Sequence, residues 1–141
     1  MERSRFLLWF TRVCWLGVVI WVSVVFCLSA LSGPDVEGIN TMKVWDKALH
    51  FIAFFAGSLA LAPAMRLTFR WPWRKTYIVC VACISLYGAL DEVHQIWTPA
   101  RSALDPLDWL ADTLGALVGT ALALYIHATI ERKNRPTTTG N

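Results

Sequence analysis

Residues 76–95 read TYIVCVACISLYGALDEVHQ, a long apolar run that ends in polar residues. Its first fifteen residues carry no formal charge. Four polar side chains then fall within five positions, namely Asp91, Glu92, His94 and Gln95. A membrane-spanning helix needs roughly 17–25 mostly apolar residues. The stretch therefore predicts a spanning helix, at about Thr76 to Trp97, that places polar groups at one of its ends.

Three further hydrophobic runs have the length of a spanning helix, and we place them at about residues 13–31, 48–65 and 107–130. Hydrophobic residues make up 56% of the 141-residue chain and charged residues 16%, whereas soluble domains average about 25% charged residues. The sequence therefore predicts an all-α fold: an integral membrane bundle of four transmembrane helices. Residues 1–131 are predicted to form this single transmembrane domain, and residues 132–141 are predicted to form a short polar cytoplasmic tail.

The cations are distributed unevenly along the predicted bundle. Ten of them lie before the first run, in the second loop or after the last run, and three lie elsewhere. In a four-helix bundle those ten share one side of the membrane. Because positive residues favour the cytoplasmic side, both termini are predicted to be cytoplasmic, and DEVHQ then faces outward. The cations form no basic stripe, so the net charge of +3 does not indicate nucleic-acid binding.

Polar residues stand at the predicted outward ends of three different helices. The first cluster is WDKALHF at residues 45–51. Its Asp46 and His50 are four positions apart and so share a helix face, with Lys47 beside them. The second cluster is LDEVHQ, in which Gln95 shares a face with both acids.

The third cluster is RSALDPLDWLADTLG at residues 101–115. Asp105, Asp108 and Asp112 are spaced by three and four positions, which makes an acidic stripe along one helix face. Pro106 suits the first turn of a helix. Asp105 is therefore predicted to be the N-cap, with the other two acids projecting toward neighbouring helices.

Ionisable side chains within a bilayer are costly and normally face the bundle interior, paired with one another or with a ligand. Gly115 and Gly119 have a small-x-x-x-small spacing that lets helices approach closely, which would hold Asp112 against its partners. Arg101 is the natural bidentate partner for the surrounding carboxylates. We therefore predict one polar pocket shared by three helix ends. Its members are Asp46, Lys47, His50, Asp91, Glu92, Gln95, Arg101, Asp108 and Asp112.

Taken in order, these clusters resemble the VanZ-like family of small membrane proteins over about residues 44 to 120. The motifs that carry the resemblance are Asp46-Lys47-x-x-His50-Phe51, Tyr87-Gly88-x-x-Asp91-Glu92-x-x-Gln95, Pro99-x-Arg101-Ser102 and Asp108-x-x-Ala111-Asp112-Thr113-x-Gly115. The chain has Asp112 where the family often has Asn. The family takes its name from a protein associated with resistance to teicoplanin. The resemblance thus implies a cell-envelope protein, expected in the bacterial cytoplasmic (inner) membrane as a multi-pass protein, and it implies no defined biochemical activity.

The favoured hypothesis is that the pocket binds the headgroup of a phospholipid or of a lipid-linked envelope precursor, either with or without modifying it. Lys47 and Arg101 are available for phosphate, and the acids and Gln95 are available for sugar or amine groups.

Three alternatives stay open. One is a metal-assisted hydrolase or transferase acting on a lipid phosphate, with His50, Glu92, Asp108 and Asp112 as candidate ligands. Another is a small proton-coupled permease, which would require oligomers. The last is a structural partner whose polar groups only fix the helix register. The sequence contains no H-E-x-x-H or G-x-S-x-G motif, so no catalytic residue and no cofactor is assigned.

Overall fold

The computed structural model describes residues 2–31, 43–99 and 104–133. Four helices occupy most of this part of the chain: α1 (Glu2–Ser29), α3 (Lys43–Phe69), α4 (Trp73–Gln95) and α5 (Pro106–Lys133). Each of them is long and apolar enough to cross a membrane. The predicted all-α bundle with four helices of spanning length is thereby confirmed. The cytoplasmic side of the termini stays a prediction.

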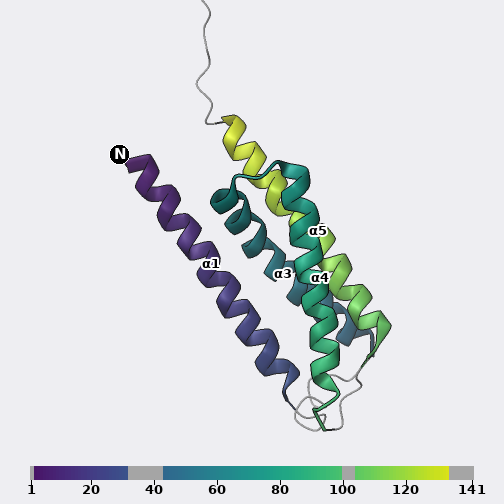
Figure 1. Cartoon of the computed structure of the whole chain (residues 1–141). Helices are drawn as coiled ribbons and strands as arrows, with labels where there is room; N and C mark the ends of the chain where they lie inside the picture. Colours follow the sequence, from purple (N-terminus) through teal and green to yellow (C-terminus); the bar gives the residue numbers. More distant parts are fainter. Residues whose placement is uncertain (1, 32–42, 100–103, 134–141) are drawn as a thin grey trace, which may run out of the picture.

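The helices alternate in direction, with α1 and α4 running one way and α3 and α5 the other (Figure 1). Helices α3, α4 and α5 pack together, and α1 lies along one side of them, mainly against α3. This arrangement brings three helix ends to the same end of the bundle: the beginnings of α3 and α5 and the end of α4. These are the ends that carry the polar clusters of the sequence.

Helices α3 and α5 form the closest helix pair. A Cβ atom built on Gly115 would lie 2.4 Å from the Phe51 carbonyl oxygen, and one on Gly119 would lie 2.6 Å from the Phe55 carbonyl oxygen. Only glycine, which has no side chain, allows the backbones of α3 and α5 to approach so closely. The contact predicted from the spacing of these two glycines is confirmed, and it holds the start of α5 against α3.

Aromatic side chains attach α1 to the other helices. The Trp21 ring fills the space left by Gly57, where an added Cβ would lie 2.3 Å from the ring. The indole N–H of Trp21 donates to the Ala53 carbonyl oxygen at 2.7 Å. From α4, the Tyr87 hydroxyl donates to the Val22 carbonyl oxygen at 3.0 Å. These two hydrogen bonds and the packing of Trp21 on Gly57 hold α1 against α3 and α4.

Large apolar side chains cover the outside of the bundle, while small and polar ones occupy much of its inside. Val19 is 59% exposed and Ile78 is 65% exposed, whereas Ser58, Thr76 and Thr120 are completely buried. Helices in a bilayer pack through small residues and hydrogen bonds, because lipid tails are as apolar as leucine. The distribution of side chains therefore suits a lipid surrounding.

Candidate functional site

Seven side chains from three helix ends form a cluster that we call the acid–histidine site. Helix α3 contributes Asp46, Lys47 and His50, α4 contributes Glu92, and the start of α5 with its preceding residue contributes Asp105, Asp108 and Asp112. The close approach of α3 and α5 at the two glycines positions most of these contacts.

Lys47 lies between the acids of this site. Its Nζ donates to Asp105 Oδ2 at 2.6 Å and to the Asp108 carboxylate, and it lies 3.7 Å from Asp46 Oδ2. The side chain of Asp108 is only 5% exposed, and that of Lys47 is 27% exposed. Hydrogen bonds between charged groups are roughly twice as strong as neutral ones. The charge of this lysine is therefore already compensated within the protein.

His50 is oriented by two aspartates of α5. Its Nδ1 lies 2.9 Å from Asp112 Oδ1, within hydrogen-bond distance, and its Nε2 lies 4.0 Å from Asp108 Oδ1. The Asp112 side chain is fully buried and that of His50 is 13% exposed. Each ring nitrogen thus faces a carboxylate, and the tautomer that carries its proton on Nδ1 donates it to Asp112.

Two buried carboxylate oxygens of the site accept no hydrogen bond within the described residues: Glu92 Oε1 and Asp112 Oδ2. Glu92 is 4% exposed, and its other oxygen accepts the Asp105 backbone N–H at 2.8 Å. Asp112 Oδ2 lies against α4, where a Cβ on Gly88 would be 2.7 Å away. Leaving a buried acceptor without a partner costs about 1–3 kcal/mol, and more if it is charged. Both oxygens would therefore stabilise a donor supplied from elsewhere.

Asp105 both caps α5 and joins the site. Its Oδ1 accepts the Leu107 backbone N–H at 2.9 Å, which confirms the predicted N-cap. The hydrogen bond from Lys47, and after it the one from Leu107, hold the pKa of the Asp105 carboxyl below its ordinary value, because both favour the charged form. From its sequence context, Asp105 is predicted only as the N-cap and not as a member of the pocket. Its spacing of three from Asp108 is the signal that it also faces Lys47.

Asp91, Gln95 and Arg101 complete the predicted pocket, and His94 belongs to the same sequence cluster as Asp91 and Gln95. Asp91 and Gln95 are both buried on α4 and bond to each other, with Gln95 Nε2 donating to Asp91 Oδ2 at 3.1 Å. Their predicted common helix face is confirmed. His94 lies on the side of α1, with its Nδ1 3.4 Å from Ser29 Oγ. Arg101 lies outside the described residues.

Acids exceed bases in the described part of the site. It contains five carboxylates and one lysine, and a protonated His50 would bring the cations only to two. The local potential therefore opposes an anionic ligand and favours a cation or a hydrogen-bond donor.

Three ligand atoms of the site are close enough to hold one metal ion. A carboxylate oxygen from Asp46, one from Asp108 and a ring nitrogen of His50 all lie within 4.8 Å of one another. Carboxylate and imidazole ligands suit divalent cations such as Mn²⁺ and Zn²⁺. The Asp108 carboxylate also binds Lys47, so a metal ion would compete with this lysine.

Comparison with known proteins establishes the family. The sequence model of the VanZ/LLP1 family matches residues 9–127, which include every residue of the acid–histidine site. The chain belongs to this family. No curated protein and no solved structure gives a significant match to the chain.

Membership of the VanZ/LLP1 family confirms the resemblance carried by the sequence motifs. The family match begins at residue 9 and so extends beyond the motifs to most of α1. Together with four helices of spanning length, it identifies a multi-pass membrane protein. Within this VanZ/LLP1 protein, the acid–histidine site combines ion pairs, buried acceptors without donors and an excess of negative charge.

Proposed function

We propose that the acid–histidine site binds the headgroup of a membrane lipid, or of a lipid-linked envelope precursor, through the amine or hydroxyl groups of that headgroup. The observation that carries the proposal is the pair of buried oxygens without a donor, Glu92 Oε1 and Asp112 Oδ2. A headgroup amine or hydroxyl supplies the missing donors. An ammonium group would in addition form charge-assisted hydrogen bonds with the carboxylates.

The charges of the site favour the amine or hydroxyl part of a headgroup over its phosphate. Lys47 is hydrogen-bonded to Asp105 and Asp108, so its positive charge is already neutralised. A phosphate would have to displace one of these carboxylates and would face the remaining acids. Of the ligand groups considered from the sequence, the amine and sugar groups are therefore the better match.

Tryptophans around the same end of the bundle support a lipid as the ligand. Trp45 precedes Asp46 and is 60% exposed, and Trp97 follows the end of α4 and is 73% exposed. Tryptophan side chains gather at the level of the lipid headgroups. If the termini are cytoplasmic, as the cation distribution predicts, the site lies at the level of the outer leaflet of the bacterial cytoplasmic membrane.

The test uses the full chain in nanodiscs that contain equal amounts of phosphatidylethanolamine and phosphatidylglycerol, followed by native mass spectrometry of the released protein. A polyprenyl-linked amino sugar serves as the second probe. We expect one of these amine-bearing lipids to be retained above its share of the bilayer. Because a hydrogen bond to a charged group contributes about 1.5–3 kcal/mol, Glu92→Gln and Asp112→Asn should each lower this retention about tenfold or more.

The matched control is Glu131→Gln, which removes an exposed acid at the other end of α5. It should leave retention of the amine-bearing lipid unchanged. If the wild-type chain retains neither probe above its bilayer share, or if all three variants lose retention equally, the proposal is rejected.

A second candidate is metal-assisted hydrolysis or transfer at a lipid phosphate, favoured by the close ligand atoms of Asp46, His50 and Asp108. A bound divalent cation would act there as a Lewis acid on a phosphoryl oxygen. Because Lys47 holds the Asp108 carboxylate, Lys47→Met should increase Mn²⁺ affinity, which electron paramagnetic resonance measures directly. If neither the wild type nor Lys47→Met binds Mn²⁺, this candidate is excluded.

A further inference from the structure

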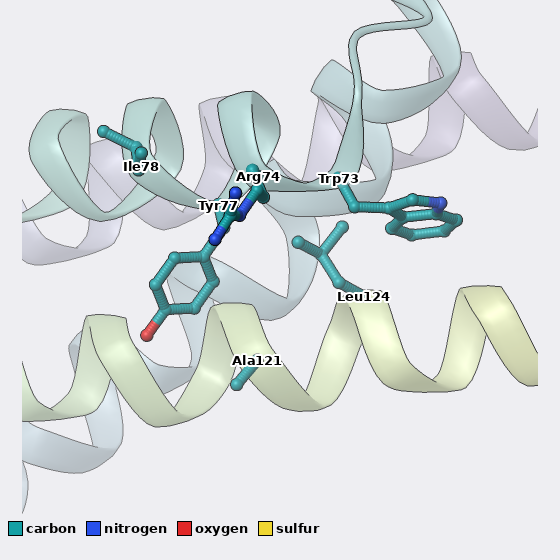
Figure 2. Close-up of a pocket in the computed structure, with 6 residues that line it drawn as sticks. All are labelled: Trp73, Arg74, Tyr77, Ile78, Ala121 and Leu124. Atoms are coloured by element: carbon teal, nitrogen blue, oxygen red, sulfur yellow. The ribbon is translucent and has the colours of Figure 1, made fainter.

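Helices α4 and α5 leave an open groove between them at the end of the bundle opposite to the acid–histidine site (Figure 2). The groove has a volume of about 590 Å³ and is lined by Trp73, Arg74, Tyr77, Ile78, Ala121 and Leu124. Figure 2 shows Trp73 and Tyr77 projecting from α4 toward α5, with Leu124 of α5 between them. Small-molecule sites typically occupy about 300–1,000 Å³, so the groove is large enough for part of a lipid.

The walls of the groove are mainly apolar and open toward the surroundings of the bundle. Ile78 is 65% exposed, while Leu124 is only 7% exposed and forms part of the inner wall. Both helices are of spanning length, so their outer surfaces face lipid tails when the chain crosses a bilayer. An acyl chain is therefore the apolar group most available to fill this groove.

Arg74 supplies the polar wall of the groove, and its guanidinium has no partner among the described residues. Two cations near it, Arg66 and Lys75, are already engaged. Arg66 lies 4.4 Å above the Trp73 ring and 3.9 Å from Glu131, and Lys75 lies 4.3 Å above the Trp71 ring. Arg74 thus differs from Arg66 and Lys75 in having a free planar set of donors, and these donors lie beside an apolar groove.

We propose that this groove binds one anionic phospholipid, with its phosphate on Arg74 and an acyl chain along Ile78, Ala121 and Leu124. Arginine donates two parallel N–H groups in a geometry that matches phosphate oxygens. Tyr77 also lines the groove, and a tyrosine ring suits the boundary between headgroup and tail.

The charge at this end of the bundle favours an anionic lipid over a zwitterionic one. Where the end of α3, the start of α4 and the end of α5 meet, the described residues include one acid, Glu131, and several cations. These cations are Arg66, Arg70, Arg74, Lys75, Arg132 and Lys133. Basic residues near a membrane surface attract anionic lipids by about 1 kcal/mol each. The site is separate from the acid–histidine site, so the two proposals can fail independently.

The first test places the full chain in nanodiscs of phosphatidylglycerol and phosphatidylcholine in equal amounts and counts retained lipids by native mass spectrometry. We expect one phosphatidylglycerol to be retained in preference to phosphatidylcholine. Arg74→Gln should lower this preference about fivefold, which corresponds to one lost basic contact of about 1 kcal/mol. The control is Arg132→Gln, which removes an exposed cation from the same end of the bundle but outside the groove, and which should retain the preference.

A second pair of variants tests the groove without changing any charge. Ala121→Phe should fill the groove and abolish retention of phosphatidylglycerol although Arg74 is intact. Leu122→Phe places the same ring on the adjacent, 40% exposed position and should have no effect. Circular dichroism of both variants checks that the helices are formed.

Any one of four results would overturn the proposal. The wild type could retain both lipids equally, Arg74→Gln could behave like Arg132→Gln, or Ala121→Phe could retain phosphatidylglycerol as well as Leu122→Phe does. A dimer that dissociates in Ala121→Phe would also overturn it, because a second copy of the chain would then occupy the groove.

Discussion

Gly115→Ala should destabilise the bundle and loosen the contact between His50 and Asp112 at the same time. The new Cβ would lie 2.4 Å from the Phe51 carbonyl oxygen and 2.9 Å from the Phe55 backbone nitrogen. These are backbone atoms of α3 and cannot rotate aside. To reach an ordinary contact of 3.4 Å, the two backbones must separate by about 1 Å, the difference between 3.4 and 2.4 Å.

The magnitude of the effect has three parts. Overpacking costs about 1–3 kcal/mol, and the better helix propensity of alanine offsets up to about 1 kcal/mol of this cost. A separation of about 1 Å would stretch the 2.9 Å contact between His50 Nδ1 and Asp112 Oδ1 beyond hydrogen-bond length. Losing a hydrogen bond to a charged group costs about 1.5–3 kcal/mol. We therefore expect the free energy of unfolding to fall by about 3 kcal/mol.

Titration with a denaturing detergent, followed by helical circular dichroism, measures this free energy of unfolding. Gly17→Ala is the matched control, because a Cβ at this position would meet Ala60 Cβ at an ordinary distance of 3.5 Å. The control should be neutral or more stable by up to about 1 kcal/mol. The imidazole chemical shifts of His50 report on its bond to Asp112. Equal stability of Gly115→Ala and Gly17→Ala, with unchanged His50 shifts, would contradict this prediction.

Asp105→Asn keeps a capping side chain but loses the ion pair with Lys47. Its deficit in thermal stability relative to wild type should be complete above about pH 3.8, the ordinary pKa of the group, and should disappear as the pH falls through the lowered pKa of the folded state. A deficit unchanged in strong acid would contradict this. Lys47→Met leaves the charges of Asp105 and Asp108 uncompensated. In a detergent unfolding assay this variant should lower the free energy of unfolding by about 1–3 kcal/mol, which is less than the cost of removing one partner of a fully buried ion pair. Adding Asp108→Asn should restore part of the loss. Equal losses in the single and double variants would contradict the pairing of Lys47 with Asp108. Trp21→Phe removes the donor to the Ala53 carbonyl and should cost about 1 kcal/mol in the same assay, whereas no cost would show that this hydrogen bond does not hold α1.

The parts of the fold that depend on local sequence were predictable. The length of each apolar run determines whether it can span a membrane, and Asp105 before Pro106 defines the start of α5. Alternation of spanning helices then places the beginnings of α3 and α5 and the end of α4 at one end. The spacing of Gly115 and Gly119 adds the close contact of α3 with α5.

The choice of partners within the site could not be predicted, because it depends on how each helix is rotated. Gln95 shares a face with two acids in the sequence, yet it bonds to Asp91, while Glu92 accepts the N–H of Asp105. The place of Gly88 against Asp112 depends in the same way on the packing of α4 on α5. The groove at the opposite end also results from that packing, so no motif indicates it.

The hydrogen bonds of the acid–histidine site help to distinguish a binding site from a structural network whose polar groups only fix the helix register. A buried polar network with a purely structural role is stabilising when all its members are satisfied, and each unsatisfied member makes it worse than an apolar core. Lys47 holds the acids of α5 together without any ligand, because it offsets their mutual repulsion. Yet Glu92 Oε1 and Asp112 Oδ2 lack donors among the described residues. A purely structural network is expected to satisfy its own acceptors, so the lack of a donor at these two oxygens supports the proposed binding role.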